Sequence, residues 1–255
     1  MHELKVDEFH LVKSIFKSLP NSVVEGNRLG RIFVDDMKTP RVALVCYRRG
    51  LYYLAGDASN HQSNQSLYEL LFRERPFYLY SFPEVWEEKL DIVLKDKATK
   101  HYRQSFDFNP EEFSSHRNWR EKIPLGFRLE RIDAELMERI ANDIMPWSLT
   151  IFWNSISDFI KKGFGFCLLH DAQIASVCYS ATVGKRECSI DIKTVEKFRR
   201  RGFAMLTASA FIEHCLGRGF LPTWECHTSN KESMATAKKL GFFEKAEFPI
   251  YIFHA

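Results

Sequence analysis

Apolar and polar residues follow one another in short blocks along the chain, each with the period of a strand or of a helix. Short runs that are wholly apolar or that alternate predict strands, and apolar residues three or four positions apart predict helices. In the first part of the chain, strands are predicted at residues 30–34, 42–47, 51–55, 77–82 and 102–108. Helices are predicted there over residues 9–19, 64–72 and 83–94.

A polar stretch at residues 109–125 interrupts this order and is the predicted linker. After it, strands are predicted at residues 127–131, 164–170, 174–181, 188–195 and 221–227 and near the C-terminus. Helices are predicted after Asp133 and over residues 151–160, 202–216 and 230–240. The pattern predicts an α/β (α+β) fold with a mixed central sheet flanked by helices, divided into domains at residues 1–115 and 123–255. The first domain follows a shorter version of the order of the second.

The composition is that of an ordinary globular protein. Of 255 residues, 45% are hydrophobic and 27% are charged, which excludes a disordered chain and a fibrous repeat. Lys and Arg number 36 against 33 Asp and Glu, so the net charge is only +3. This balance does not favour a protein that binds nucleic acid or a membrane surface.

Cysteine usage and hydropathy indicate the compartment. The six cysteines form no C-x-x-C pair and show no zinc-ligand spacing. Most of them lie in apolar runs, which is typical of buried, reduced thiols. No apolar run reaches the roughly 20 residues that a membrane helix needs, and the first residues lack the apolar centre of a signal peptide. We therefore expect a cytoplasmic protein that binds no metal ion.

The segment with the clearest chemistry joins a predicted strand to a predicted helix at residues 190–204. Three successive arginines occupy the loop, and Gly202 and Ala204 stand where the helix begins. Unpaired N–H groups and the helix dipole make such an N-terminus a site for phosphate, and a glycine lets the backbone approach closely. An arginine triplet alone is also typical of a solvated basic surface or of a nucleic-acid site, although the near-neutral charge argues against the second.

This segment and the helix that follows resemble the GNAT superfamily of N-acetyltransferases. The acyl-CoA signature of that family is Arg or Gln, two residues, Gly, one residue, and Gly or Ala, and the run from Arg199 to Ala204 matches it in full. A second family motif places Asn at a strand-to-helix turn with Gly-Phe eleven and twelve positions later, here Asn230, Gly241 and Phe242. Within the superfamily, this stretch is similar to the subgroup related to the zwittermicin A resistance acetyltransferase. Members of that subgroup carry an additional N-terminal domain, so the first domain is interpreted as a shortened GNAT-like half.

The resemblance implies that acetyl-CoA, as cosubstrate, binds in a V between two splayed parallel strands. Backbone groups of Ile192 and Thr194 would pair with the pantetheine amides, and Asn230 would reach the same arm. The pyrophosphate would be held by the backbone of Arg199, Arg200, Arg201, Gly202, Phe203 and Ala204. A primary amine of a small molecule would attack the thioester directly.

Three side chains on the two strands beside the expected cofactor are candidates for the base that takes the proton of the amine. Asp191 lies on the first strand, and Glu225 and His227 share one face of the second. His227 is a candidate because imidazole ordinarily titrates near neutral pH. A structural or solvated role remains the alternative for each of the three.

The position of the usual acid is the main departure from the family pattern. Many GNAT enzymes protonate the leaving thiolate with a Tyr seven positions after the Asn, and here that position is Ala237. The chain is therefore either an active N-acetyltransferase, in which water or another side chain serves, or a catalytically silent acyl-CoA-binding sensor. The expected partner is a small-molecule amine and not nucleic acid or a membrane, and a homodimer stays open. Nearby aromatic residues line an acceptor pocket or belong to the core: Trp147, Phe152 and Trp153.

Overall fold

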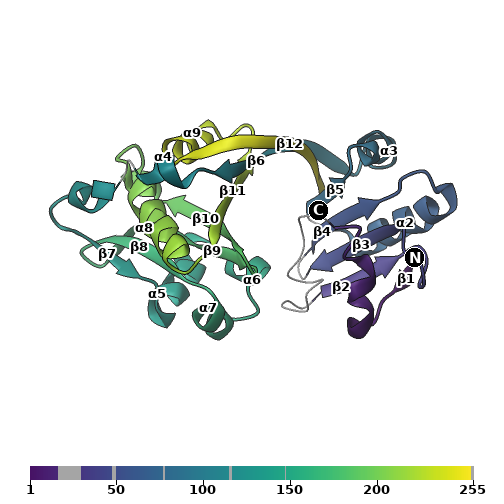
Figure 1. Cartoon of the computed structure of the whole chain (residues 1–255), viewed down its shortest axis with the longest axis horizontal. Helices are drawn as coiled ribbons and strands as arrows, with labels where there is room; N and C mark the ends of the chain where they lie inside the picture. The colour runs from purple at the N-terminus through teal and green to yellow at the C-terminus, as the bar shows by residue number, and fades with distance from the viewer. Residues whose placement is uncertain (17–29, 48–49, 77, 115–116, 147, 254–255) are drawn as a thin grey trace. The chain divides into compact units, whose positions relative to one another are not determined.

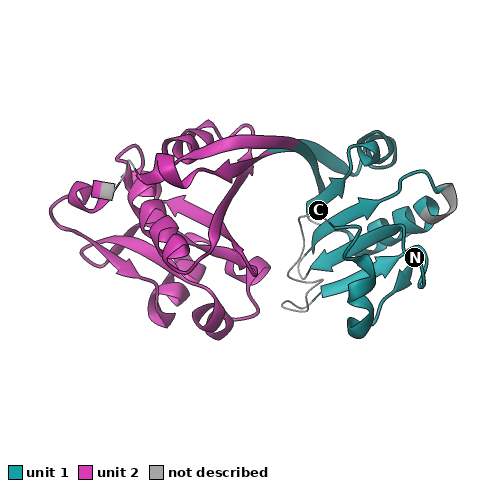
Figure 2. Cartoon of the chain, in the orientation of Figure 1, with its two compact units in different colours: residues 1–103, 248–255 teal, residues 104–247 magenta. Residues whose placement is uncertain are grey.

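The computed structural model describes residues 1–16, 30–47, 50–76, 78–114, 117–146 and 148–253 (Figure 1). The chain forms two compact units, residues 1–103 with 248–255, and residues 104–247 (Figure 2). The sequence suggested a division into residues 1–115 and 123–255. In the structure, the end of the last strand is grouped with the first unit.

The sheet of the first unit has the strand order β1-β2-β3-β4-β5-β12. Its strands are β1 (His2–Glu3), β2 (Gly30–Val34), β3 (Val42–Tyr47), β4 (Leu51–Gly56), β5 (Tyr78–Phe82) and the C-terminal part of β12 (Phe242–Phe253). Strands β4 and β5 are parallel, and the other neighbours are antiparallel. The helical segments of this unit are η1 (Val6–Val12), α2 (His61–Glu74) and α3 (Val85–Val93).

The apolar runs of β3 and β4 lie in the core of this unit. Both strands are buried almost from end to end, which explains why their sequences are continuously apolar rather than alternating. Leu67 of α2 and Trp86 and Leu90 of α3 pack into the same cluster as Leu44 and Leu54 of the sheet. The two helices thus supply the apolar residues that cover this face.

The sheet of the second unit has the order β6-β11-β10-β9-β8-β7, and the first part of β12 lies beside β6. Its strands are β6 (Ala98–Phe108), β7 (Phe127–Arg131), β8 (Gly165–His170), β9 (Gln173–Val183), β10 (Glu187–Thr194) and β11 (Leu221–His227). The pair β10 and β11 is parallel, and β7 to β10 are antiparallel. Its helical segments are α4 (Pro110–Ser114), η3 (Arg117–Lys122), α5 (Ala134–Arg139), η4 (Ile140–Ile144), α6 (Ser148–Phe152), α7 (Ile156–Lys162), η5 (Glu196–Phe198), α8 (Phe203–Gly217) and α9 (Lys231–Lys239).

Helix α8 covers one face of this sheet. Most of its side chains are small or apolar and they surround the helix, as expected of a buried helix, and Figure 1 shows α8 lying across β8, β9 and β10. Ala208, Phe211 and Ile212 are completely buried there. The other core of the unit joins residues of α5, η4, α6 and α7 to β8 and β9, and it contains Phe159 and Tyr179. The sheet therefore has an α8 face and an opposite face covered by shorter helices.

The two units repeat one order of elements. The series β2-β3-β4-α2-β5-α3-β6 has the same order as β8-β9-β10-α8-β11-α9-β12, including a parallel pair of strands joined by a helix. The last strand of each series ends in the other unit: residues 104–108 of β6 belong to the second unit, and residues 248–253 of β12 to the first. The first unit thus has the order of elements that a shortened copy of the second unit would have.

One predicted helix, over residues 151–160, is wrong as a single element. The chain forms α6 and α7 instead, because Ser155 starts a new helix by accepting a hydrogen bond from the N–H of Asp158 (3.0 Å). Trp153, between the two helices, is buried, and its Nε1 donates to the carbonyl of Ser180 (2.8 Å). Trp153 thus packs in the core.

Two other segments differ from the expectation. The stretch expected as a linker contains α4 and η3, and its Trp119 is buried and donates to the Glu213 carboxylate of α8 (3.0 Å). The helix predicted over residues 9–19 is the short 3-10 helix η1, followed by a turn, and its remainder from residue 17 lies outside the described residues.

Candidate functional site

Strands β10 and β11 are paired only where they begin. Their parallel register ends at Ser189 and Thr223, although β10 continues to Thr194 and β11 to His227. The pairing of β10 with β9 has a β-bulge between Ser189 and Ile190, at the same level. Beyond this point β10 and β11 are no longer paired, and the two strands splay.

The splayed part of β10 presents backbone groups on its open side. The N–H of Val195, just after β10, donates to the carbonyl of Ala175, just within β9 (3.0 Å). Positions that pair with the neighbouring strand alternate along an antiparallel pair. The backbone groups of Ile192 and Thr194 therefore point away from β9, toward β11, as the sequence interpretation requires.

The loop before α8 has the conformation of an anion-binding turn. Arg200 and Gly202 both have positive φ angles, 61° and 77°, and alternating left-handed residues in such a turn direct successive N–H groups into one concavity. Gly202 is the N-cap of α8 and supplies no side-chain hydrogen bond. A Cβ placed on Gly202 would meet no atom within 4 Å, so the space in front of the loop is open.

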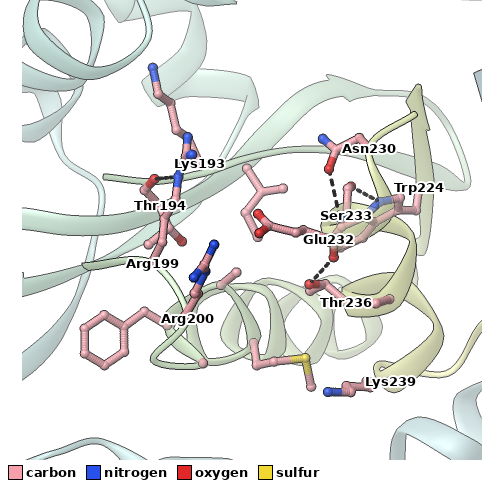
Figure 3. A pocket seen from close by; sticks show the side chains of 16 residues that line it. Lys193, Thr194, Arg199, Arg200, Trp224, Asn230, Glu232, Ser233, Thr236 and Lys239 are labelled. Atoms are coloured by element: carbon pink, nitrogen blue, oxygen red, sulfur yellow. Dashed lines mark hydrogen bonds between the residues drawn. The ribbon is translucent and has the colours of Figure 1, made fainter. Parts of the chain in front are cut away.

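A pocket of about 670 Å³ joins these features to helix α9 (Figure 3). It is lined by Ile192, Lys193, Thr194, Arg199, Arg200, Gly202, Phe203, Ala204, Met205, Trp224, Asn230, Glu232, Ser233, Ala235, Thr236 and Lys239. The lining holds four Lys or Arg side chains and one Glu. This excess of positive charge, together with the N-terminus of α8, suits an anionic ligand.

Side chains from two sides define the pocket. Figure 3 shows Thr194 and Arg199 on one side and Asn230 on the other. Arg199 Nε donates to the Thr194 carbonyl (3.5 Å), which ties the loop to the end of β10. Asn230 Oδ1 accepts from the N–H of Ser233 (3.0 Å) and caps α9.

The cofactor-binding residues predicted from the sequence line this pocket, with the exception of Arg201. The guanidinium of Arg201 lies over the rings of Phe127 and Phe203, with its Cζ 5.2 and 4.8 Å from their centroids. The three arginines of the loop are therefore not equivalent: Arg199 and Arg200 line the pocket, and Arg201 stacks on aromatic side chains.

The three candidate bases, Asp191, Glu225 and His227, are not among the residues that line the pocket. Residues that alternate with them, such as Ile192 and Trp224, pack toward α8. Since successive strand residues point to opposite faces, the three candidates lie on the opposite face. The last paired positions of the two strands are Ser189 and Thr223. Asp191 and Glu225 each lie two residues further along, so they are at the same level on the two splayed strands.

Asp191 has defined partners on that face. Ser148, the first residue of α6, donates its hydroxyl proton to the Asp191 carboxylate. The buried Tyr179 of β9 in turn donates to the Ser148 hydroxyl. Asp191 is thus held by two side chains from other elements.

Three further positions singled out in the sequence have structural surroundings. Ala237 is completely buried in the core cluster that includes Trp224, so the place of the usual acid is not at the pocket. Cys226 is buried in the same cluster. Trp147 lies outside the described residues.

The chemistry of the pocket fits an acyl-CoA. A pyrophosphate needs N–H donors and positive charge, which the loop and the start of α8 provide. A pantetheine arm needs backbone groups at a strand edge, and Ile192 and Thr194 provide these. The open space before Gly202 gives a phosphate access to the backbone.

Some pocket residues were not found from the sequence. Glu232, Thr236 and Lys239 come from one face of α9, at spacings of four and three residues that place side chains together on a helix. The signal that could have identified them is this spacing after Asn230, which places all three on the face of α9 that lines the pocket. Lys193 lies between two predicted residues, and Trp224 belongs to the stretch that resembles the family, but neither was assigned to the site.

Within the described part of the chain, no group of three or more His, Cys, Asp or Glu side chains is arranged to hold a metal ion. Of the described helices, none is both long enough and apolar enough to cross a lipid bilayer.

Comparisons with known proteins place these features in a family. The profile of a family described as GNAT acetyltransferase matches residues 10–251. The chain is 31% identical, over 260 residues and 98% of each chain, to a Bacillus subtilis (strain 168) protein called uncharacterized N-acetyltransferase YdfB.

Solved structures show the same fold. A GNAT-like protein from Streptococcus suis 89/1591 is 24% identical and superimposes with a TM-score of 0.79, over 97% of this chain and 99% of that one. A GNAT-family acetyltransferase from Colwellia psychrerythraea is 14% identical, with a TM-score of 0.58 over 100% and 99% of the two chains. These similarities extend over both units.

Proposed function

Because the chain belongs to the GNAT acetyltransferase family, we propose that it transfers an acetyl group from acetyl-CoA to a primary amine of a small molecule. The observation that carries the proposal is the pocket in which the open edge of β10, the N-terminus of α8 and a basic lining come together. Membership of the subgroup related to the zwittermicin A resistance acetyltransferase is part of this proposal. So is a cytoplasmic location, supported by free and buried thiols at all six cysteines.

The residues of the pocket would hold the cosubstrate by its phosphates and its amides. Backbone N–H groups from Arg199 to Ala204 would bind the pyrophosphate, with Arg200 and Lys239 adding positive charge. Ile192, Thr194 and Asn230 would bind the pantetheine arm. Acetyl-CoA supplies an activated thioester whose thiolate is a good leaving group.

Acidic side chains support a cationic acceptor. Asp191 and Glu225 lie on the face of β10 and β11 opposite the pocket, level with the splay. A carboxylate there would attract an ammonium group and take one of its protons. The amine nitrogen then forms a bond to the carbonyl carbon as the carbon–sulfur bond breaks, and the electron pair of the broken bond leaves with sulfur. The nitrogen gives up its second proton to water as the amide forms. The thiolate takes up a proton from water or from a hydroxyl such as that of Ser233, since Ala237 offers none.

The test is a panel of amines with acetyl-CoA and the full chain, comprising aminoglycosides, amino acids, polyamines and short peptides. Release of the CoA thiol is followed with a thiol reagent, and the acetylated amine is identified by its mass. We expect at least one small amine to be acetylated, and the Asp191→Asn variant to lose most of that activity while keeping its affinity for acetyl-CoA.

The alternative, a silent acyl-CoA-binding sensor, is motivated by Ala237. It predicts calorimetric binding of acetyl-CoA without release of thiol for any amine. That result would replace the proposed activity, and failure of acetyl-CoA to bind at millimolar concentration would remove both.

A further inference from the structure

A line of hydrogen bonds leads from the buried core to Asp191. Tyr179 of β9 is 0% exposed, and its hydroxyl donates to Ser148 Oγ at the start of α6. Ser148 Oγ donates to the carboxylate of Asp191 on β10. Side chains of α6 and β9 thus meet at one carboxylate of β10.

The direction of the protons along this line is fixed. Burial, and next the charge of Asp191, raise the pKa of Tyr179 well above its usual value, so the phenol stays protonated. The phenol donates to Ser148, whose own proton then points to Asp191. A carboxylate that accepts such a bond is held in its charged form and in one orientation.

We infer that Tyr179 and Ser148 are positioning residues that hold Asp191 as the charged, oriented base of acetyl transfer. This inference rests on the proposed function. In the step concerned, the Asp191 carboxylate takes one proton of the bound ammonium group, which frees the nitrogen lone pair to attack the thioester carbonyl carbon. The hydrogen bond from Ser148 to Oδ2 holds the Asp191 carboxylate in one orientation.

The other groups around Asp191 set its electrostatic surroundings. The sequences of β9 and α6 contain no Asp, Glu, Lys, Arg or His. From β9 come Tyr179 and Cys178, and burial raises the pKa of the Cys178 thiol well above its usual value, so it is neutral. Glu225 and His227 come from the adjacent β11, and Lys193 from β10 itself, where its Nζ donates to the carbonyl of Ile144 (2.5 Å).

If Tyr179 and Ser148 had a purely structural role, removing them would have a different effect. In that case Ser148 only satisfies the buried hydroxyl of Tyr179, and removing either group lowers stability without changing the proton affinity of Asp191. The two roles differ in one measurable quantity, the pH at which activity is lost on the acid side.

The decisive experiment records the pH profile of kcat/KM for Ser148→Ala and Tyr179→Phe with the best amine of the panel. The base works when deprotonated, so activity is lost as the pH falls through its pKa. Removing the Ser148 donor raises that pKa, and we expect the acid limb to move up by about one pH unit, a tenfold change in proton affinity. Tyr179→Phe should move it by less, and Ser148→Thr should restore it.

Tyr251→Phe is the matched control. Tyr251 is also a buried tyrosine, and it donates to the Asp91 carboxylate (2.8 Å) in the first unit. It should leave the profile unchanged. The affinity for acetyl-CoA should stay the same in all four variants, because Ser148 and Tyr179 do not line the pocket.

Two results are distinguishable. If the wild-type chain binds acetyl-CoA and acetylates no amine, the proposed function and this role both fail. If the wild type is active and the acid limb of Ser148→Ala and Tyr179→Phe coincides with that of the wild type, the inference alone is wrong. Carbon-13 NMR of labelled aspartate, with Asp191→Asn to assign the signal, measures the same shift of the Asp191 pKa without turnover.

Discussion

Gly202 combines a left-handed backbone with open space in front of it. Its φ is 77°, and a Cβ there would touch nothing within 4 Å. In Gly202→Ala, the left-handed conformation should lower the free energy of unfolding by about 1–2 kcal/mol. The added methyl group would stand where a phosphate is expected to reach the backbone, so the Kd for acetyl-CoA should rise at least about tenfold. Calorimetry and thermal unfolding measure the two effects.

Gly219 offers a close control for this substitution. It follows α8, its φ is 75°, and a Cβ there also meets nothing within 4 Å, but it does not line the pocket. Gly219→Ala should cost the same stability and leave the Kd unchanged. Equal Kd values for the two variants would show that the loop does not bind the phosphates.

The arginines of the loop should differ in function. Arg200 lines the pocket, whereas Arg201 lies over the rings of Phe127 and Phe203. Arg200→Ala should weaken acetyl-CoA binding about tenfold. Arg201→Ala should cost about 0.5–1 kcal/mol of stability, as for an exposed cation–π contact, and change binding little. Fluorescence titration of both variants decides this, and a larger loss of affinity in Arg201→Ala would contradict the assignment.

Single residues also mark what the sequence could predict. Gly202 and its neighbours form a contiguous motif, so the sequence alone predicts both their position before a helix and their suitability for binding phosphate. The partner of Asp191, Ser148, is 43 positions away in the chain. Only the packing of α6 on the sheet brings them together, and no local pattern contains that information.

At the scale of elements, α9 depends on Asn230 for its start. The side-chain oxygen accepts the N–H of Ser233, which leaves the amide nitrogen for a ligand in the pocket. Asn230→Asp keeps the N-cap and replaces the donor with a negative charge. Its stability should match the wild type, while its affinity for acetyl-CoA should fall about tenfold or more.

Two companion variants separate the cap from the ligand. Asn230→Ala loses both the cap and the donor, and should also lose about 1 kcal/mol of stability. Asp133→Ala removes the corresponding cap of α5, where Asp133 accepts from the N–H of Leu136 (2.8 Å). It should lower stability alone. If Asn230→Asp binds as tightly as the wild type, Asn230 has no role in the pocket.

Elements were predictable where one local signal decides them. Strands β7 and β11 follow directly from their alternating apolar residues, and the start of α5 follows from Asp133. The break between α6 and α7 was missed because apolar spacing continues through it, while a buried Trp153 and a capping Ser155 end one helix and begin another. The pairing of β10 with β11 ends at Ser189 and Thr223, which the sequence of either strand alone does not reveal.

At the scale of the whole molecule, the two units share an order of elements but differ where the pocket stands. The parallel strands β4 and β5 of the first unit are paired along five positions, from Leu51↔Tyr78 to Ala55↔Phe82, and do not splay. In the first unit, two side chains of α3 donate hydrogen bonds to the loop before α2. Trp86 Nε1 donates to the carbonyl of Gly56 (2.9 Å), and Lys89 Nζ donates to the carbonyl of Ala58. In the second unit the equivalent space, between the loop and α9, is the pocket.

We therefore expect one acyl-CoA site in the chain, in the second unit, and none among the described residues of the first. Calorimetric titration of acetyl-CoA into the full-length protein tests this most directly. We predict saturable binding with a stoichiometry of one per chain, abolished or weakened by Gly202→Ala and not by Gly219→Ala. A stoichiometry of two, or binding that is equally tight in both variants, would contradict it, as would the absence of binding at millimolar acetyl-CoA.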